Sequence, residues 1–358
     1  MRVVTVIGNR PQFVKAVAVS GPLREHHHEI LIHTGQHYDD TLSAVFFREL
    51  GLPAADHELG LGQGSNGEQT GRMLQALSPL VAAERPDVVL VYGDTNSTLA
   101  GGLAGAQSGV PVAHVEAGMR SYDRSMPEEL NRVLCDHLST LLLCPSQAAV
   151  KNLRAEGLEG RAEVVGDVMV DVFRLVASQS HSAATVLDGA GVSAGAYLLA
   201  TVHRAANVDD PERLARLCDL LLALPEPVVL PLHPRTRARL EEAGEMGRLA
   251  AGVRLLEPQG YVPFTSLLAN ARAVITDSGG VQKEAYLAGV RCLTLRDRTE
   301  WTETVDSGWN TLVDLDVAAT LRALGRPLPR PGPALYGDGH AGRRVVRALE
   351  DLVQARRS

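Results

Sequence analysis

Short apolar runs rich in β-branched residues alternate along the chain with longer stretches of mixed polarity. In the first half these runs occupy residues 3–7, 30–33, 88–92, 111–115, 141–144 and 162–165, and in the second half residues 197–202, 228–232, 253–256, 273–276 and 291–295. Runs of this kind are typical of strands buried on both faces, and the stretches between them suit crossover helices. The pattern therefore predicts an α/β protein with two doubly wound parallel sheets.

The two series of predicted strands are separated by residues 178–195, which are rich in Ser, Ala and Gly and carry no strand pattern. We place a domain boundary in this stretch. The resulting domains, residues 1–178 and 179–340, each have the size of a Rossmann-like unit. A chain of 358 residues also exceeds the size at which a single hydrophobic core usually stops growing.

The last stretch of the chain, residues 341–358, combines apolar side chains at helical spacing with a charged opposite face. Val345, Leu349 and Val353 mark the apolar stripe. We expect a closing helix here.

Composition and charge argue against several classes of function. A net charge of −7 and the lack of any run of basic residues disfavour a nucleic-acid surface. No apolar stretch approaches the ~20 residues of a membrane span. The first residues already form a strand pattern, so we expect a cytoplasmic protein without a signal peptide. The cysteines lack zinc or disulfide spacing, which predicts reduced, buried thiols at Cys135, Cys144, Cys218 and Cys292.

Polar residues concentrate directly after the predicted strands. The loops that carry them are residues 8–11, 34–37, 93–95, 116–118, 203–204, 233–235 and 277–280. In open parallel sheets, ligands bind just beyond the carboxyl ends of the strands. We therefore expect each domain to present a polar edge, and the two edges to face one another across a deep cleft.

Residues 277–284 (DSGGVQKE) follow a predicted strand and open a predicted helix. Free backbone N–H groups and the helix dipole at such a turn attract an anion, and phosphate is the obvious guest. Gly279 and Gly280 allow close approach of the backbone. Ser278 can donate through its hydroxyl, and Glu284 can accept from ribose hydroxyls. The alternative is an ordinary turn with Ser278 as the helix N-cap.

The corresponding loop of the first domain begins at residues 8–11 (GNRP), with Arg10 and Lys15 placed to enter the cleft. It matches neither the GxGxxG dinucleotide loop nor the GxxxxGK[ST] phosphate loop. This argues against nicotinamide chemistry and nucleotide hydrolysis. The alternative is that both cations are solvated surface charges.

Residues 125–132 (SMPEELNR) are typical of a helix start. Ser125 and Glu128 have the spacing of a capping box. Arg132 lies one turn beyond Glu128, where it can pair with that carboxylate or present a cation to a ligand. The buried face of this helix is expected to consist of Leu130, Val133, Leu134 and Leu138.

Three carboxylates are expected at one rim of the first sheet, because Asp94 and Glu116 follow strands and Glu128 begins a helix. Grouped carboxylates repel one another, which raises at least one pKa and provides an acid and a base. The spacing does not support a metal site. His203 and His233 end equivalent strands of the second domain, where each is either a participant in chemistry or a structural histidine.

Together these motifs resemble the non-hydrolysing UDP-N-acetylglucosamine 2-epimerases over nearly the whole chain. The matching segments are residues 8–11, 34–37, 92–95, 114–118, 127–132, 277–284 and 336–339. The resemblance implies a glycosyltransferase-B-like pair of Rossmann-like domains, a C-terminal helix that crosses back onto the first domain, and a homodimer. It also implies a UDP-sugar substrate, elimination of UDP to a 2-acetamidoglucal, re-addition from the opposite face of the sugar, and no cofactor.

The resemblance implies two groups of functional residues. The catalytic acid/base group is Asp94, Glu116, Glu128 and His203, and which carboxylate removes the C2 proton is left open. The substrate contacts are Arg10, Lys15 and Arg132, with His233, Ser278, Gly279 and Gly280 at the phosphates, Glu284 at the ribose and Phe264 beside the uracil.

Some departures from the family pattern bear on the substrate and on regulation. Ala206 stands where a Glu is common, and residues 36–39 (QHYD) differ from the loop of the enzymes that their own substrate activates. Further variations are found at residues 46–50, 67–71 and 299–301. They look like the branch that contains UDP-2,3-diacetamido-glucuronate 2-epimerases. A uronate needs a further cation, which Arg120 or Arg124 can provide; the alternative is that both are ordinary surface residues.

Other classes of function give different expectations. A hydrolysing relative would release free UDP together with the sugar, and a glycosyltransferase of the same architecture would need an acceptor. A nucleotide-sugar sensor would gain nothing from clustered carboxylates, which repel an anionic ligand. The epimerase is therefore the favoured function.

Overall fold

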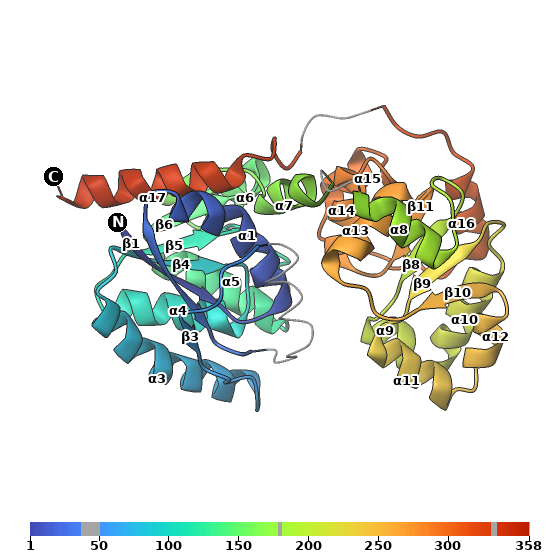
Figure 1. Cartoon of the computed structure of the whole chain (residues 1–358), viewed down its shortest axis with the longest axis horizontal. Helices are drawn as coiled ribbons and strands as arrows, with labels where there is room; N and C mark the ends of the chain where they lie inside the picture. Colours follow the sequence, from blue (N-terminus) through green and yellow to red (C-terminus); the bar gives the residue numbers. More distant parts are fainter. Residues whose placement is uncertain (37–50, 178–180, 331–334, 358) are drawn as a thin grey trace. The chain divides into compact units, whose positions relative to one another are not determined.

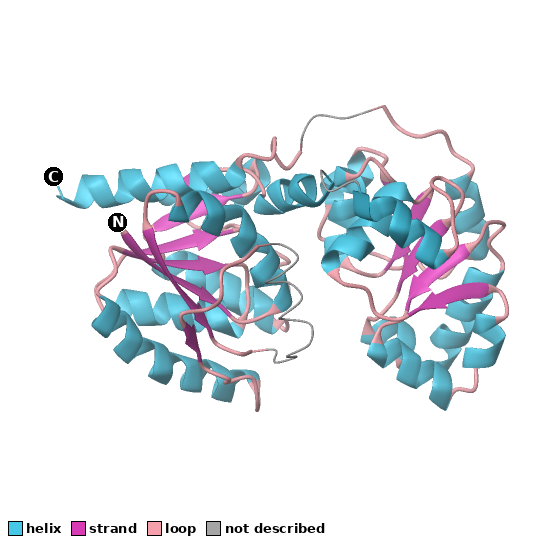
Figure 2. Cartoon of the chain, in the orientation of Figure 1, coloured by secondary structure: helices cyan, strands magenta, loops and turns pink. Residues whose placement is uncertain are grey.

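The structure is a computed structural model of the 358-residue chain, and it describes residues 1–36, 51–177, 181–330 and 335–357. The chain forms two compact units, Met1–Arg174 with Ala334–Ser358, and Leu175–Pro333. Each unit is built on a parallel sheet with flanking helices, as Figures 1 and 2 show. Both units are Rossmann-like, which confirms the predicted fold class.

The first sheet has seven parallel strands in the order β3-β2-β1-β4-β5-β6-β7. Their bounds are β1 Arg2–Ile7, β2 His28–His33, β3 His57–Glu58, β4 Val88–Tyr92, β5 Val112–Val115, β6 Leu141–Cys144 and β7 Ala162–Val164. Every apolar run of the first half is confirmed as a strand. Strand β3 is not predicted from the sequence, because it has only two residues and Glu58 is exposed.

The second sheet has six parallel strands in the order β10-β9-β8-β11-β12-β13. Their bounds are β8 Leu198–Thr201, β9 Val228–Pro231, β10 Val253–Leu256, β11 Ala273–Thr276, β12 Arg291–Thr294 and β13 Asn310–Leu312. The runs of the second half are likewise confirmed, and the short edge strand β13 is additional. In both sheets the order reverses once, and in open parallel sheets ligands commonly bind beside the loops that leave the sheet at such a point.

Helices connect the strands in both units. In the first unit they are α1 Arg10–Arg24, α3 Asn66–Glu84, α4 Asn96–Gln107, α5 Pro127–Leu138, α6 Gln147–Ala155, the 3-10 turn η1 Glu159–Arg161, and α17 Ala341–Arg357. Helix α7, Val168–Ala177, runs across the division between the units. In the second unit they are α8 His181–Ala190, α9 Ala205–Val208, α10 Pro211–Leu222, α11 Pro234–Glu242, α12 Met246–Ala250, α13 Tyr261–Asn270, α14 Gly279–Leu287, α15 Thr302–Asp306 and α16 Val317–Leu324.

The C-terminal helix α17 lies along α1 in the first unit (Figure 1). Val345 and Leu349 are fully buried and Val353 nearly so, which confirms the closing helix. The carboxylate of Asp171 accepts hydrogen bonds from the first backbone amides of α17, at 3.1 and 2.9 Å. An anion at this position also favours the helix dipole. The helix is therefore fixed both by its apolar face and by its N-terminus.

Helix α5 buries only part of its predicted face, since Leu138 packs against the core and Val133 is half-buried. Leu130 and Leu134 are 46% and 51% exposed, so the expectation that they are buried is wrong. The buried residues of the helix are Glu129, Asn131, Cys135 and Asp136. Their polar side chains meet hydrogen-bond partners in the interior, and this outweighs the apolar pattern that the sequence offers.

The capping box predicted at the start of α5 is also wrong. The N-cap residue is Met126, which provides no side-chain cap. Ser125 donates instead to the carboxylate of Asp123, at 2.6 Å. Glu128 therefore does not take part in a capping box, although its spacing from Ser125 suggests one.

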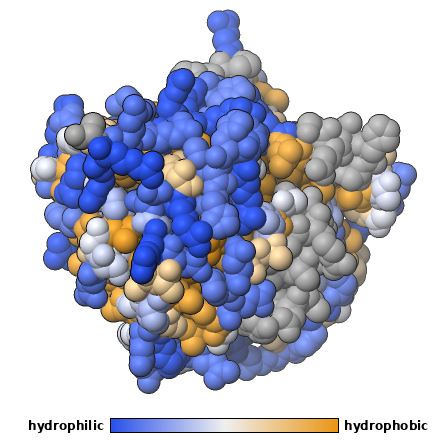
Figure 3. Space-filling view, turned by 60° about the vertical axis from the view of Figure 1, so that its left-hand side comes forward, coloured by the Kyte–Doolittle hydropathy of each residue, from blue (hydrophilic) through white to orange (hydrophobic). Residues whose placement is uncertain are grey.

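The surface and the thiols agree with the composition. All four cysteines are free and buried. Hydrophilic residues cover most of the face seen in Figure 3, with apolar ones interspersed. None of the described helices combines the length and the apolar run that a membrane crossing requires.

Helix α17 approaches α1 so closely at Gly342 that an added methyl group there is expected to destabilise the first unit. A Cβ atom on Gly342 would lie 1.9 Å from the carbonyl oxygen of Ala18, whereas one on Gly71 of α3 would meet no atom within 4 Å. We expect Gly342→Ala to destabilise the first unit by about 1–3 kcal/mol. Gly71→Ala is the matched control and should stabilise α3 by ~0.5–1 kcal/mol.

Calorimetry on both variants checks this expectation. Tryptophan fluorescence, which reports only the second unit because both tryptophans (Trp301 and Trp309) lie there, should be unchanged. An equal effect of the two substitutions would contradict the packing of α17 on α1.

Candidate functional site

The loop between β1 and α1 is fastened to the end of β4 by Gln12. Asn9 is the N-cap of α1, and its side chain accepts a hydrogen bond from the backbone amide of Gln12. The Gln12 side-chain amide donates to the carbonyl of Tyr92 at 2.8 Å and to the hydroxyl of Thr98 at 2.9 Å. Lys15, one turn farther along α1, is thereby held near the loop that follows β4.

Lys15 forms an ion pair with Glu116, the residue that follows β5. Both side chains are largely buried, with 13% and 14% exposed. Burial alone would lower the pKa of Lys15, but the charges of Glu116 and Asp94 and the hydrogen bond to Glu116 outweigh it, and the pKa is raised. Lys15 is therefore a permanent cation at this edge of the sheet.

Asp94, the second predicted carboxylate, pairs with Arg132 of α5 at 2.5 Å. Burial lowers the pKa of Arg132, yet the charge of Asp94 and its hydrogen bonds raise it overall. Asn131 donates to the backbone carbonyl of Asp94 at 3.0 Å. The two carboxylates thus each have a cation, and these cations offset the mutual repulsion that the sequence predicts.

The backbone at both carboxylate loops lies in the left-handed region. Gly93 has φ of 65° and Glu116 has φ of 70°. For a glutamate this conformation costs about 1–2 kcal/mol, so neighbouring contacts must hold it. A Cβ atom on Gly93 would lie 3.2 Å from the Lys15 ammonium and 3.3 Å from the Glu116 carboxylate. The loop after β4 therefore needs a glycine to pass beside the ion pair.

Glu128 and its neighbour Glu129 have different environments. Glu128 is exposed on the first turn of α5, and among the described residues no hydrogen bond or ion pair joins it to Asp94 or Glu116. Glu129 is buried, and its carboxylate accepts from the amides of Ser121 and Tyr122 and pairs with Arg132. Burial raises its pKa, but these hydrogen bonds lower it overall. Glu129 holds the loop before α5.

In the second unit, the fully buried Asp277 at the end of β11 holds the loop after β8. Its carboxylate accepts the backbone amides of His203, at 3.2 Å, and Arg204, at 2.9 Å. It also accepts from the Asn207 side chain at 3.1 Å. The His203 ring lies 3.5 Å from the same carboxylate through Nδ1, which directs Nε2 away from it. Asp277 therefore orients His203, a role that sequence reasoning missed.

The structure brings His203 and His233 together, with ring centroids 5.4 Å apart. His233 is the N-cap residue of α11, and its Nδ1 accepts from the amide of Arg235 at 3.2 Å. One ring nitrogen of His233 is therefore used to cap helix α11.

The predicted phosphate loop starts α14. Ser278 is the N-cap residue, but its side chain makes no capping bond, so the ordinary-cap alternative does not explain its hydroxyl. A Cβ atom on Gly279 would lie 2.3 Å from a carboxylate oxygen of Glu300. Glu300 in turn pairs with Arg296 at 2.9 Å and Arg204 at 3.7 Å. This carboxylate beside Gly279 was not recognised in the sequence.

The other predicted contacts of the second unit lie on helices beside this loop. Gly280 is exposed in the first turn of α14, and Glu284 is buried in the same helix. Phe264 is half-buried near the start of α13. The amide of Phe264 bonds to the carbonyl of Gly260, as expected for a helical residue.

Some predictions fall outside the described part of the chain. The backbone of Arg10 begins α1, but its side chain lies outside the described residues. Residues 37–39 of the loop after β2 and residues 46–50 lie entirely outside the described part of the chain. Among the described residues, no group of three His, Cys, Asp or Glu side chains suits a metal ion.

Arg120, one of the two cations considered for a uronate, is committed to internal partners. Its side chain is 1% exposed and forms ion pairs with Asp136 and Glu156, each at 2.7 Å. Arg124 is exposed in the loop before α5. Of the two cations, only Arg124 is therefore accessible.

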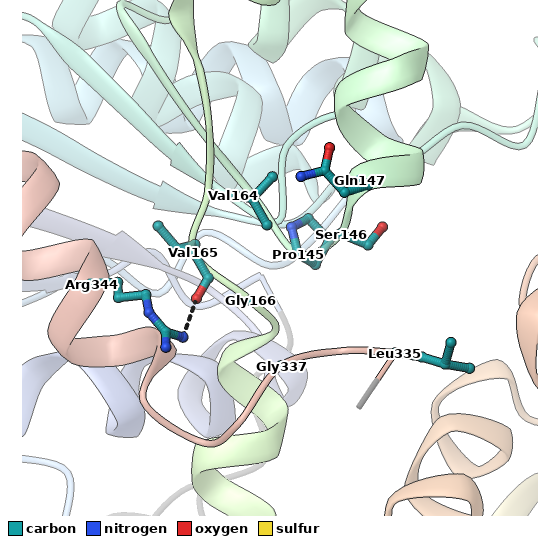
Figure 4. Close-up of a pocket in the computed structure, with 9 residues that line it drawn as sticks. All are labelled: Pro145, Ser146, Gln147, Val164, Val165, Gly166, Leu335, Gly337 and Arg344. Atoms are coloured by element: carbon teal, nitrogen blue, oxygen red, sulfur yellow. Dashed lines mark hydrogen bonds between the residues drawn. The ribbon is translucent and has the colours of Figure 1, made fainter. Parts of the chain in front are cut away.

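A cavity of about 310 Å³ opens at the carboxyl ends of β6 and β7, and Figure 4 shows its walls. It is lined by residues 145–147 and 164–166 and by Leu335, Gly337 and Arg344. Arg344 donates to the carbonyl of Val165 at 3.2 Å and is tied to Asp338. No residue of the predicted site lines this cavity.

Comparison with known proteins decides the family. Residues 23–350 match the family described as UDP-N-acetylglucosamine 2-epimerase. The chain belongs to this family. The resemblance drawn from the loop motifs is thereby confirmed.

Relatives in the UDP-N-acetylglucosamine 2-epimerase family match over almost the entire chain. A Methanococcus maripaludis protein named UDP-N-acetylglucosamine 2-epimerase homolog is 43% identical, with 98% of this chain and 100% of the relative covered. The Pseudomonas aeruginosa UDP-2,3-diacetamido-2,3-dideoxy-D-glucuronate 2-epimerase is 44% identical over 98% and 100% of the two chains.

A solved structure from the same family shares the fold of the chain. The crystal structure of the Methanocaldococcus jannaschii UDP-GlcNAc 2-epimerase, in complex with UDP-GlcNAc and UDP, has a TM-score of 0.88 and 38% identity. It covers 98% of this chain and 100% of its own. The glycosyltransferase-B-like class of two Rossmann-like domains is therefore confirmed.

The environment of Asp277 predicts how the loop of His203 responds to a substitution. The substitution Asp277→Asn removes the charged acceptor of the backbone amides of His203 and Arg204. Hydrogen bonds to a charged group stabilise by ~1.5 kcal/mol or more. Hydrogen exchange of the His203 and Arg204 amides should therefore become about tenfold faster. Hydrogen exchange with NMR or mass-spectrometric detection measures this rate. Asp209→Asn, which changes an exposed carboxylate of the same unit, is the control and should leave these amides unchanged. Unchanged exchange in Asp277→Asn would contradict the role of Asp277.

Proposed function

We propose that the protein interconverts UDP-N-acetylglucosamine and UDP-N-acetylmannosamine, as a non-hydrolysing 2-epimerase. The single observation that carries this proposal is the match to the epimerase family along almost the whole chain. The M. jannaschii neighbour, whose structure contains UDP-GlcNAc and UDP, adds support because its fold agrees over 98% of this chain. The protein is then an isomerase that acts on a nucleotide sugar.

The proposed reaction has two halves. A base removes the proton from C2 of the sugar while the bond between C1 and the diphosphate oxygen breaks, which releases UDP and leaves 2-acetamidoglucal. An acid then returns a proton to the opposite face of C2, and UDP adds again to C1. The C2 proton is weakly acidic, so its loss must be coupled to the departure of a stabilised diphosphate.

The residues of the first unit fit the acid/base half of this chemistry. Asp94, Glu116 and Glu128 are the candidate acids and bases, and His203 of the second unit joins them in our assignment. The pairing of Asp94 with Arg132 and of Glu116 with Lys15 supports the proposal, because a neighbouring cation favours the ionised carboxylate, which is the form that accepts a proton. Arg10 completes the cationic contacts.

The residues of the second unit fit the UDP half. We assign the diphosphate to His233, Ser278, Gly279 and Gly280, the ribose to Glu284 and the uracil to the side of Phe264. The N-terminus of α14 supports this assignment, since free amides and the helix dipole favour an anion there. The proposal includes a cytoplasmic homodimer, with no metal or other cofactor and no nucleic-acid or membrane partner.

A second candidate is the related UDP-2,3-diacetamido-glucuronate 2-epimerase. The observation that favours it is the P. aeruginosa relative of that name, which is 44% identical to this chain. The reaction is the same, and only the substituents at C3 and C6 of the sugar differ. Because Arg120 is committed to Asp136 and Glu156, the additional cation for the uronate would be Arg124.

The proposal is tested by incubating the protein with each UDP-sugar separately and separating the products by ion-exchange chromatography. Formation of UDP-N-acetylmannosamine, without free N-acetylmannosamine, supports the proposed function. Product only from the diacetamido-uronate would move the protein to the second candidate. Accumulation of free sugar with UDP would indicate a hydrolase instead.

The assignment of the carboxylates predicts a division between turnover and binding. Asp94→Asn, Glu116→Gln and Glu128→Gln should each lower kcat by about 10²–10⁴-fold, the range for the loss of a general acid or base. The affinity for UDP, measured by calorimetry, should change little, because UDP is assigned to the other unit. Glu159→Gln, an exposed carboxylate of the first unit, is the control. Normal turnover in all three variants would contradict the assignment.

Because His233 is assigned to the diphosphate, its substitution is expected to weaken UDP binding. His233→Asn keeps an N-cap for α11 but removes the imidazole, so stability should hold while UDP binding weakens about tenfold. Arg237→Ala, on the exposed side of the same helix, is the control. Binding of UDP by His233→Asn as tightly as by the parent would show that the phosphates lie elsewhere.

A further inference from the structure

A buried cluster of charged groups lies directly beneath the two carboxylate loops of the first unit. His114 of β5 and Asp136 of α5 are fully buried, and their side chains meet at 2.7 Å. The other ring nitrogen of His114 lies 2.6 Å from the carbonyl oxygen of Gly93. Arg120, also buried, adds a second cation to Asp136 at 2.7 Å.

The partners of His114 fix its protonation. A carbonyl oxygen can only accept, so Nε2 must carry a hydrogen to bond to Gly93. Asp136 also accepts from the amide of Gly118 at 3.0 Å and from Arg120, which favours the ionised carboxylate. Nδ1 of His114 must then carry a hydrogen as well. The ring is an imidazolium that donates in two directions.

The surroundings agree with this protonation. Burial lowers the pKa of His114, but the neighbouring Cys135 and the hydrogen bond and charge of Asp136 outweigh it, and the pKa is raised well above its usual value. Burial raises the pKa of Asp136, while His114 and Arg120 lower it overall. Burial, together with the charge of Asp136, raises the pKa of Cys144 to about 12, so it stays a neutral thiol.

A buried ion pair does not by itself explain why these residues are present. Well-packed apolar side chains of similar volume often stabilise a protein as well as a buried pair does. The position of this pair is more informative. Gly93 immediately precedes Asp94, and His114 lies two residues before Glu116 in the chain. Asp136 lies one turn after Arg132, the cation that pairs with Asp94.

The pair therefore links three elements that carry the candidate reaction. Its bond to the Gly93 carbonyl holds the loop of Asp94 against β5, and its bond to Asp136 holds α5, which carries Arg132. The amide of Gly93 in turn donates to the carbonyl of Val115 at 3.0 Å, so the two left-handed turns are tied to each other from both sides. Loss of any one of these hydrogen bonds is expected to displace both Asp94 and Glu116.

We propose that His114, held by Asp136 and donating to the Gly93 carbonyl, is a positioning residue that fixes Asp94 and Glu116 for the reaction. This inference rests on the proposed function, because it assigns the two carboxylates to catalysis. His114 itself touches neither the substrate nor the reacting atoms in this account.

Substitution of His114 by asparagine or by glutamine tests its two hydrogen bonds one at a time. The side-chain nitrogen of asparagine stands as many bonds from Cα as Nδ1, and that of glutamine as many as Nε2. His114→Asn therefore keeps a donor toward Asp136 and loses the bond to Gly93, whereas His114→Gln keeps the bond to Gly93. Both lose the same positive charge. His137→Gln, which changes an exposed histidine of α5 paired with Glu156, is the control.

The expected result is a difference between the two variants in kcat alone. His114→Asn should lower kcat about 100-fold, the effect of a displacement of about 1 Å at the reacting groups, and His114→Gln no more than about tenfold. The affinity of both for UDP should stay within about twofold of the parent. Circular dichroism and calorimetry establish that each variant is folded. Equal kcat in the two variants, or parental kcat in folded His114→Asn, would overturn the inference.

A second measurement does not depend on turnover. In protein labelled with ¹⁵N-histidine, the His114 signals are assigned by their loss in His114→Asn, and both ring nitrogens should be protonated at pH 7. One unprotonated ring nitrogen would overturn the two-donor assignment. If the parent epimerises neither UDP-sugar, the proposed function fails, and the ring nitrogens still decide the bonding of His114.

Discussion

Carboxylates that gather at the end of a parallel sheet must be matched by cations, because their mutual repulsion would otherwise oppose folding. The first unit meets this constraint with the pairs Lys15–Glu116 and Asp94–Arg132, which bring α1, α5 and the loops after β4 and β5 together. Left-handed backbone at Gly93 and Glu116 directs both loops toward the cations. The arrangement of the candidate site follows from this pairing of charges.

The second unit holds its loops by a different device. Asp277 is fully buried without a strong cationic partner, and the backbone amides of His203 and Arg204 satisfy its charge instead. Hydrogen bonds to backbone amides stabilise a carboxylate without adding a formal positive charge near the ligand. Loops held by ion pairs and a loop held by backbone amides are thus both built on Rossmann-like sheets of similar strand order.

The sequence predicts the strands well because a buried parallel strand needs a continuous apolar run, and such runs are visible without any structure. It predicts the loop residues for the same reason, since they follow the runs directly. On helix α5, Leu130 and Leu134 were wrongly expected to be buried, because Asn131 and Asp136 are buried instead by hydrogen bonds to residues far apart in the chain. The partners of Arg120 and the role of Asp277 depend on such long-range contacts too, and no local pattern reveals them.

The central claim is that the chain moves a proton at C2 of a UDP-linked 2-acetamido sugar. Proton NMR of UDP-N-acetylglucosamine incubated with the protein in deuterated water tests it most directly, because a base that exchanges its proton with solvent leaves deuterium at C2. The account predicts deuterium at C2 of the manno product and, with time, of the starting sugar. A manno product that retains its original C2 proton would contradict removal of that proton by a solvent-exchanging carboxylate.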